Sequence, residues 1–229
     1  MIFFAICALS VWVILRYAKV SWIKPLAIFL IVNKGTETLY RLIQGQWDSI
    51  PIEYSTITYF VLPLVILFNI EDWKRAFAFM GLLSSSTYLV SFFLTGQIIY
   101  ENNGLYNTVQ GFINHSVLLG ISFPIMREKP FKNTNKLIWI GTLIMILYMV
   151  IVSSFIDYSN KYLFIAILLT DNVVIDQFKQ VPFFGIIAVY YLIACIIYQF
   201  IIKGYLFLCN LEYKREQRNQ NNDASLVHN

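Results

Sequence analysis

Residues 136–156 read KLIWIGTLIMILYMVIVSSFI, an apolar run with one charged side chain at its start. A helix needs about 20 such residues to cross a membrane. Apolar runs of comparable length recur at roughly residues 2–18, 22–44, 51–70, 75–98, 105–126 and 182–208. In lipid the backbone N–H and C=O groups must form their hydrogen bonds within a helix or a closed barrel. Barrel strands alternate apolar and polar side chains over about ten residues. These long, continuous runs predict an all-α polytopic membrane bundle of about seven transmembrane helices.

The composition excludes an ordinary soluble protein. Of the 229 residues, 58% are hydrophobic and 13% are charged, and the mean hydropathy is +0.63. A soluble domain carries roughly 25% charged residues. Seven spans leave room only for short connections and a small polar tail. We expect one transmembrane domain over residues 1–211, a disordered cytoplasmic tail over residues 212–229, and a multi-pass protein of the cell membrane in contact with membrane lipids.

The basic residues indicate the orientation. They gather in alternate connections and in the tail, at Arg16, Lys19 and Lys24, then Lys74 and Arg75, then Arg127, Lys129, Lys132 and Lys136, and finally Lys214, Arg215 and Arg218. Cytoplasmic connections carry the excess of lysine and arginine. The amino terminus is therefore expected outside and the carboxyl terminus inside. The net charge of +4 reflects this topology, and we expect no nucleic-acid partner.

The three cysteines, Cys7, Cys195 and Cys209, lie in or beside apolar runs and show no disulfide or metal-ligand spacing. We therefore expect no metal and no cofactor. The sequence leaves open whether the chain forms a homo-oligomer or joins partner subunits in the membrane.

The connection from Tyr158 to Gln180 contains an eight-residue apolar stretch, Tyr162–Leu169. This stretch is too short to span a bilayer, but it can lie in the interface or dip into the bundle. Two interpretations stay open: a cover over the outer mouth of the helices, and a surface loop lying flat on lipid.

The second run carries a group of charges at membrane depth. Asn33, Glu37 and Arg41 recur every four residues with Lys34 adjacent, so Glu37 and Arg41 can pair on one helix face. Polar groups inside a membrane are costly and usually face the bundle interior. The pair is either a structural ion pair that fixes helix packing or part of a polar lining for a ligand.

The fourth run carries small hydroxyl side chains at spacings of three and four, namely Ser84, Thr87, Ser91 and Thr95. Small residues allow membrane helices to approach closely. This stripe favours a close-packing face over a substrate track.

The third run opens with a polar segment. Ser55, Thr58 and Tyr59 project together, whereas Glu53 points about 200° away from Ser55 around the helix axis. Serine and threonine in membrane helices often bond to the carbonyl four residues earlier, so a structural role is favoured for these hydroxyls. As site residues, Thr58 and Glu53 are candidates for polar lining.

His115 lies about ten residues into the fifth run and is the only histidine outside the tail. Gln110 and Asn114 form a polar pair at spacing four beside it. Histidine suits proton transfer near neutral pH, and an ionisable group inside a membrane suggests a functional site. A neutral imidazole with one hydrogen bond would equally serve packing, so both roles stay open.

Several strings, in order and over about two thirds of the chain, resemble the pattern of YwaF-type bacterial membrane proteins. They are Trp47, residues 50–56 (IPIEYST), residues 60–64 (FVLPL), residues 112–115 (FINH), Asn160 with residues 162–164 (YLF), and residues 180–184 (QVPFF). The same superfamily includes animal membrane lipid transacylases. The resemblance therefore implies acyl transfer or hydrolysis of a lipid ester.

In those transacylases a cysteine of the third-span motif takes the acyl group and a later histidine assists. By resemblance the histidine corresponds to His115, whereas Ser55 occupies the cysteine position and Glu53 the position of a histidine or glutamine. Ser55 would attack the ester, and His115 would act as general base. Asn114 or Asn160 would donate to the oxyanion.

The chief alternative is a small-solute transporter, or the substrate-binding subunit of one, without enzymatic activity. It would hold a polar ligand with the second-run polar residues, including Glu37 and Arg41, and use His115 as a ligand or proton group. A third interpretation is a bundle that only scaffolds partners. An enzyme needs Ser55 and His115 facing one cavity open to lipid, although upright helices would offset them by about 10 Å in depth. A transporter needs a cavity centred on the second run.

Overall fold

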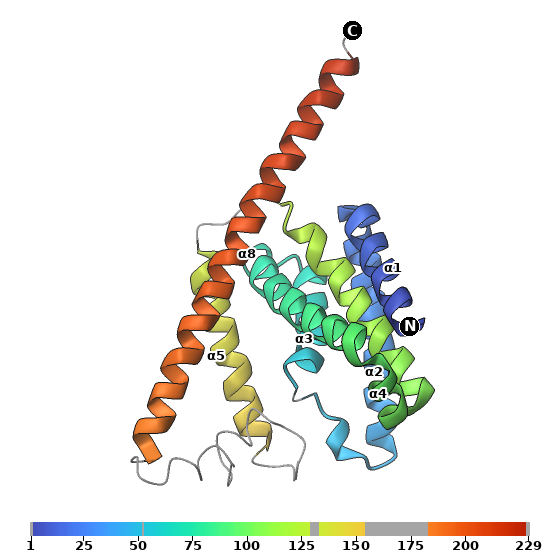
Figure 1. Ribbon diagram of the computed structural model, residues 1–229, viewed down its shortest axis with the longest axis vertical. Coiled ribbons are helices and arrows are strands. Elements are labelled where there is room, and N and C mark those ends of the chain that lie inside the picture. The colour runs from blue at the N-terminus through green and yellow to red at the C-terminus, as the bar shows by residue number, and fades with distance from the viewer. Residues whose placement is uncertain (1, 52, 129–132, 154–182, 228–229) are drawn as a thin grey trace.

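The computed structural model describes residues 2–51, 53–128, 133–153 and 183–227 (Figure 1). Within these ranges the chain forms helices and no strand, which confirms the all-α fold for this part of the molecule. The elements are α1 (Ile2–Tyr17), η1 (Val20–Trp22), α2 (Ile23–Ile43), η2 (Trp47–Ser49), α3 (Tyr54–Leu67), α4 (Glu71–Ile125), α5 (Thr134–Ser153) and α8 (Phe183–Val227).

The long α4 is a hairpin of two helical limbs, residues 71–94 and 105–125. The helix breaks at Thr95, with φ −130°, and at Gly104, with φ 73°. Glycine tolerates a positive φ because it has no Cβ atom. Contacts between the limbs show that they run antiparallel: Lys74 to Glu128, Gly81 to Ser122, Tyr88 to His115, and Phe92 to Phe112.

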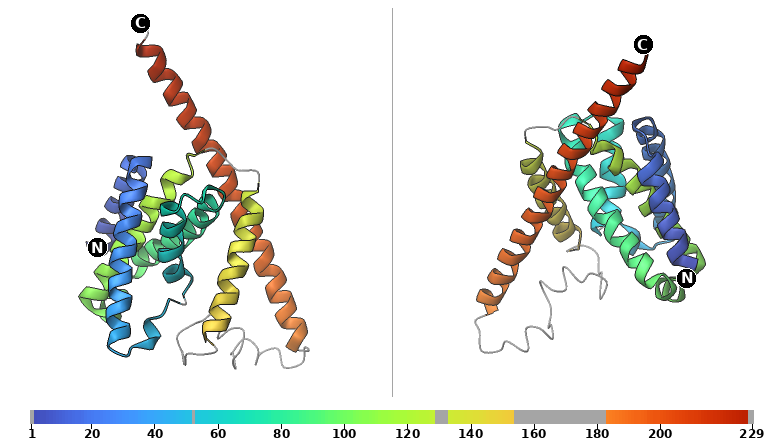
Figure 2. Two further views of the ribbon diagram at one scale, coloured as in Figure 1. Left: turned by 180° about the vertical axis from the view of Figure 1, so that it is seen from behind. Right: turned by 45° about the horizontal axis from the view of Figure 1, so that its top comes forward.

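The other helices pack around this hairpin (Figures 1 and 2). In α1, Phe3 packs against Phe92 of the first limb, with ring centroids 5.5 Å apart. In α2, Asn33 bonds to Asn114 of the second limb. The pair α5 and α8 lies on the other side of the first limb, where Tyr205 donates to the carbonyl of Arg75 at 3.1 Å. The hairpin is therefore the centre of the bundle.

In the described part of the chain each of the seven apolar runs contains a helical segment, and the fourth and fifth runs correspond to the two limbs of α4. By length and composition, three helices can cross a membrane: Glu71–Ile125, Thr134–Val152 and Leu192–Arg218. Phe3–Tyr17 and Val20–Ile43 pass the same criterion only together, across a bend of 111°. The described residues thus supply three or four candidate spans. The number is below seven because α4 counts once, and α1 and α3 have only 16 and 14 residues.

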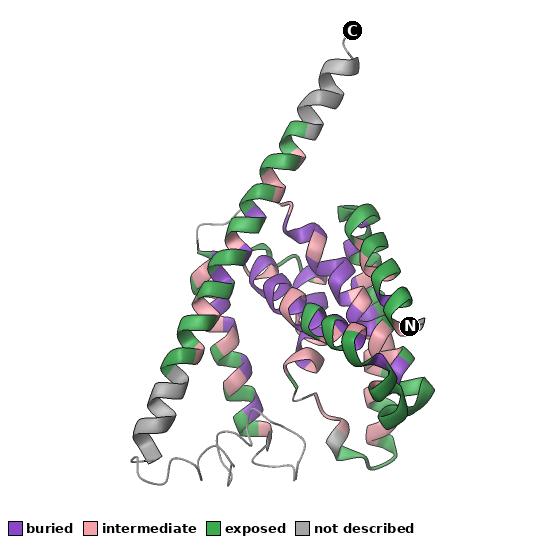
Figure 3. Cartoon of the chain, viewed as in Figure 1, coloured by how far each residue is buried: buried purple, intermediate pink, exposed green. Residues whose placement is uncertain are grey.

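Buried residues gather around the α4 hairpin (Figure 3), while many large apolar side chains lie at the surface. Leu30, Leu62 and Leu118 are fully buried, from α2, α3 and the second limb of α4. Large apolar side chains also point outward, including Leu94 at 71% and Phe200 at 69% exposure. Monomeric soluble proteins rarely expose contiguous apolar patches larger than a few hundred Å². This surface is suited to contact with lipid.

Two expectations about polar segments differ from the structure. The sequence predicts disorder from residue 212, whereas α8 continues as a helix to Val227 and projects beyond the other helices (Figure 1). The predicted small-residue stripe is also not a packing face, because Thr87, Ser91 and Thr95 are exposed and only Ser84 is buried. The predicted interface segment Tyr158–Gln180, with Asn160, lies outside the described residues.

The close approach of the limbs occurs instead at Gly81. A Cβ atom at this position would meet Ser122 Oγ, and would lie 3.0 Å from Leu62 and 3.1 Å from Leu118. Close backbone approach at small residues is the usual basis of helix packing in lipid, where water does not drive association.

Replacing Gly81 with alanine should therefore destabilise the bundle by about 1–3 kcal/mol, because the added methyl group forces the limbs apart. Gly204→Ala in α8 is the matched control, since nothing lies within 4 Å of a Cβ atom there, and it should be neutral or slightly stabilising. Thermal unfolding of the detergent-solubilised variants measures both. Equal unfolding midpoints for the two variants would contradict the packing described at Gly81.

Candidate functional site

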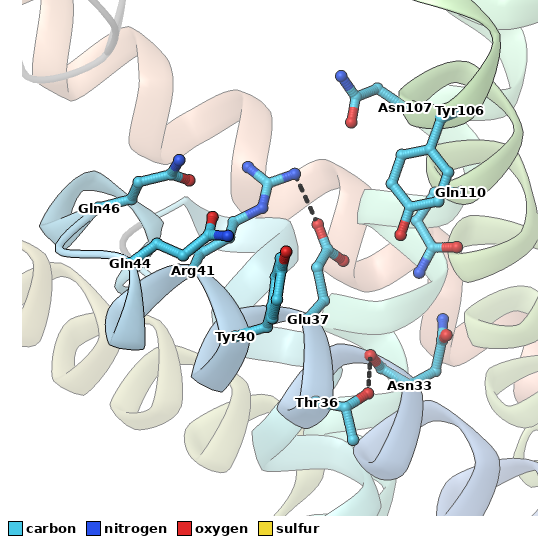
Figure 4. A pocket seen from close by; sticks show the side chains of 10 residues that line it. All are labelled: Asn33, Thr36, Glu37, Tyr40, Arg41, Gln44, Gln46, Tyr106, Asn107 and Gln110. Carbon is cyan, nitrogen blue, oxygen red and sulfur yellow. Dashed lines mark hydrogen bonds and ion pairs between the residues drawn. The ribbon is translucent and has the colours of Figure 1, made fainter.

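A polar cleft of about 570 Å³ opens between α2, the turn that follows it, and the start of the second limb of α4 (Figure 4). The lining residues are Asn33, Thr36, Glu37, Tyr40, Arg41, Gln44, Gln46, Tyr106, Asn107 and Gln110. All ten side chains carry a hydrogen-bonding group. In a chain with an apolar surface, this concentration of polar groups marks the cleft as the leading candidate site.

One carboxylate in the cleft serves two cations. Glu37 Oε1 lies 3.0 Å from Arg41 Nη2, and Glu37 Oε2 lies 2.6 Å from Lys34 Nζ. The predicted Glu37–Arg41 pair is confirmed. Glu37 and Lys34 are each 14% exposed, and Arg41 is 39% exposed. The pair to Lys34 is therefore shielded from water, whereas the Arg41 guanidinium reaches into the open part of the cleft.

The deep end of the cleft is closed by two asparagines. Asn33 Nδ2 donates to Asn114 Oδ1 at 2.7 Å, joining α2 to the second limb of α4. Asn114 is buried, and Asn33 lines the cleft. This bond connects the wall of the cleft to the segment of α4 that carries His115.

His115 is buried between aromatic rings. The His115 ring stacks on the Tyr88 ring, with centroids 3.9 Å apart and an interplanar angle of 10°. It makes an edge contact with the Tyr59 ring, with centroids 5.3 Å apart. Lys34 Nζ lies 5.6 Å from the centre of the Tyr59 ring. Nδ1 of His115 is buried and has no hydrogen-bond partner among the described residues. The imidazole is thus packed as part of the core, and its Nδ1 atom makes no hydrogen bond among the described residues.

Ser55 lies one turn before Tyr59 on α3, so the two residues share a helix face about 6 Å apart along the axis. The ring contact of His115 with α3 is made by Tyr59, one turn further along the helix than Ser55. None of the ring or hydrogen-bond contacts of His115 among the described residues involves Ser55. The Ser55–His115 pair stays a prediction.

The other predicted lining residues of the third run do not line the cleft. Thr58 is buried and its hydroxyl donates to the carbonyl of Tyr54 at 2.6 Å, as expected for threonine in a membrane helix. Glu53 is exposed and lies just ahead of α3 as its capping residue. Asn160 lies outside the described residues.

Several residues of the site were not predicted from the sequence. Tyr106 and Asn107 complete the cleft across from α2, and Tyr88 covers His115. Arg75 is buried, and its Nη2 donates to the carbonyls of Ile125 and Glu128 at the end of the second limb. A cation suits this position because helix carboxyl ends carry partial negative charge. The only sequence signal for Arg75 was its place in a basic connection.

No protein-family model matches the chain, and comparisons with curated proteins and with solved structures likewise find no match. The resemblance to YwaF-type proteins therefore stays a prediction. Among the described residues, no group of three or more His, Cys, Asp or Glu side chains is placed to hold a metal ion.

Asn33→Ala should cost about 1–3 kcal/mol of stability, because it leaves the buried Asn114 amide without its partner. Asn103→Ala is the matched control, since Asn103 is an exposed asparagine of α4, and it should change stability by less than about 0.5 kcal/mol. Thermal unfolding in detergent gives both values. If both variants lose the same stability, the Asn33–Asn114 bond does not close the cleft in solution.

Proposed function

We propose that this protein is a multi-pass protein of the cell membrane that binds a small polar solute in the cleft beside α2, as a transporter or as the substrate-binding subunit of one. The observation that carries the proposal is the position of the cleft. It is centred on the second apolar run, as a transporter requires, and Ser55 and His115 are not among its lining residues. Its volume lies in the range of about 300–1,000 Å³ typical of small-molecule sites.

The packing directions support the seven-span arrangement that this proposal includes. The limbs of α4 run antiparallel, and pairs such as Phe3 with Phe92 and Cys7 with Leu89 show that α1 runs antiparallel to the first limb. Pairs such as Asn33 with Asn114 and Leu26 with Gly120 give the same relation for α2 and the second limb. α1, α2 and the two limbs of α4 thus have the directions expected of a chain that crosses the membrane at each apolar run.

The charges support an amino terminus outside and a carboxyl terminus inside. At one end of the bundle, Arg127 donates to the carbonyl of Ala18 at 3.2 Å and pairs with Glu212 at 3.4 Å, which brings basic connections and the start of the polar tail together. Lysine- and arginine-rich connections favour the cytoplasmic side. The cleft lies at the opposite end and would open to the outside.

A polar route from the cleft towards the bundle centre also favours solute binding over pure scaffolding. Arg41 and Glu37 lie at its open part, the Asn33–Asn114 bond follows, and His115 lies beyond it. Polar groups at this depth are costly in a membrane unless they serve a site or pair with each other. In a transporter, the asparagine bond would be the closure that opens when the solute moves inward.

Lipid acyl transfer or hydrolysis by Ser55 and His115 is the second candidate function. The observation in its favour is the contact between His115 and Tyr59, one turn from Ser55 on the same face of α3. The mechanism would need the Ser55 hydroxyl and an imidazole nitrogen to come within hydrogen-bonding distance of about 3 Å. A rotation of the His115 side chain away from Tyr88 would be part of that approach.

Solute binding can be tested with the purified full-length protein and a panel of small organic acids, amines and neutral polyols at constant ionic strength. At least one class should raise the thermal unfolding midpoint, because a ligand that binds only the folded state stabilises it. Gln110→Leu should abolish this shift, since Gln110 lines the cleft. Gln97→Leu, an exposed glutamine of the same helix, should retain it. No shift with any class would contradict solute binding.

The enzymatic candidate has its own assay. The protein is supplied with labelled phospholipids, with and without a lyso-lipid acceptor, and compared with Ser55→Ala and His115→Ala. If Ser55 and His115 react, each variant should lower turnover about 10²–10⁴-fold. Thr56→Ala is the control, since its hydroxyl bonds to the carbonyl of Glu53, and should keep activity. Turnover that is unchanged in both variants would exclude the mechanism.

A further inference from the structure

The charged groups around the cleft do not balance. Among the described residues that line it, Glu37 carries the one carboxylate, and both of its oxygens already contact cations, Lys34 through Oε2 and Arg41 through Oε1. Two cations therefore share one anion, so the cluster of Lys34, Glu37 and Arg41 keeps one positive charge in excess, although Lys34 itself lies behind the lining of the cleft. The remaining lining residues are neutral amides and hydroxyls, which accept either sign of ligand. The excess charge favours a ligand with a negative group.

Arg41 is the cation best placed to hold such a group. Lys34 is 14% exposed and lies at 2.6 Å from Glu37, whereas Arg41 is 39% exposed and lies at 3.0 Å from the same carboxylate. A guanidinium carries five N–H donors in a planar fork. Arg41 can therefore keep its contact with Glu37 through Nη2 and still bind a second anion. Figure 4 shows its guanidinium beside the Glu37 carboxylate, with Tyr106 and Gln110 of the second limb on the far side of Glu37.

We infer that the solute bound in the cleft carries a carboxylate or phosphate group and that Arg41 binds this group directly. The inference rests on the proposed solute-binding function and names its ligand class. Glu37 acts as the positioning residue: it holds Arg41 towards the cleft, and it also competes with the ligand for the guanidinium. Lys34 keeps Glu37 in place from the buried side.

This arrangement predicts opposite effects for the two members of the Glu37–Arg41 pair. Arg41→Gln removes the charge that binds the anion and should weaken binding about ten- to a hundredfold, as expected for a hydrogen bond to a charged group. Arg41→Lys keeps the charge but loses the planar fork, so it should bind with intermediate affinity. Glu37→Gln removes the competing carboxylate and should tighten anion binding by about threefold or more. A pair that only fixes helix packing would lose binding in all three variants.

The experiment uses the full-length protein in detergent and isothermal titration with four probes: succinate, inorganic phosphate, the neutral analogue succinamide, and the cation 1,4-diaminobutane. Succinate or phosphate should bind at least tenfold more tightly than succinamide, and the diamine should not bind. Arg41→Gln should remove this preference. Arg16→Gln, at an exposed arginine at the end of α1 far from the cleft, is the matched control and should bind like the unmodified chain. Thermal unfolding without ligand shows whether each variant is folded.

The outcomes separate the inference from the function on which it rests. If succinamide or the diamine binds as tightly as the anions, through a site that Gln110→Leu removes, solute binding stands and the anion class is wrong. If no probe binds, the anion inference is wrong, and solute binding is then decided by the wider panel of organic acids, amines and neutral polyols. A final experiment measures the stability of the protein in nanodiscs with and without phosphatidylglycerol. If phosphatidylglycerol stabilises the protein through Arg41 and neither soluble anion does, the negative group belongs to a lipid headgroup and the solute inference is overturned.

Discussion

The two limbs of α4 approach each other at Gly81 without room for a side chain, and the remaining helices depend on that contact. Lipid provides no hydrophobic drive between helices, so close packing and interhelical hydrogen bonds hold a membrane bundle together. α1 packs on the first limb, α2 packs on the second, and α5 with α8 packs on the far side of the first. Separating the limbs at Gly81 would therefore disturb the surfaces on which α1, α2, α5 and α8 pack.

The same hairpin explains why polar groups can lie deep in the bundle. It aligns Tyr88 of the first limb with His115 of the second, and the stacked rings shield the imidazole on one face. The neighbouring Asn114 then reaches Asn33 of α2. A buried amide is tolerated when its partner is present, so this bond allows the polar Asn114 side chain to lie inside an otherwise apolar core.

Helices, and pairs within one helix, could be predicted from the sequence, but contacts between helices could not. Apolar runs indicated each helix, and the spacing of four residues indicated the Glu37–Arg41 pair, because both patterns are local. The stack of Tyr88 on His115 depends on the fold of the hairpin, which no local spacing encodes. The polar segment after residue 212 suggested disorder, yet it continues α8 as a helix. The exposed stripe at Thr87 and Ser91 failed as a packing prediction, because the spacing defines a face but not what covers it.

The face of α2 on which α3 packs accounts for the position of the cleft. Gly35 of α2 lies against α3, since a Cβ atom at this position would be 4.0 Å from the Phe60 ring. Glu37 comes two residues later, about 200° around the helix axis, so its face of α2 points away from α3. None of the ten lining residues belongs to α3. The polar face of α2 meets the second limb of α4 instead, where Asn33 bonds to Asn114. Because α3 packs on the opposite side of α2, the cleft forms between α2 and the second limb.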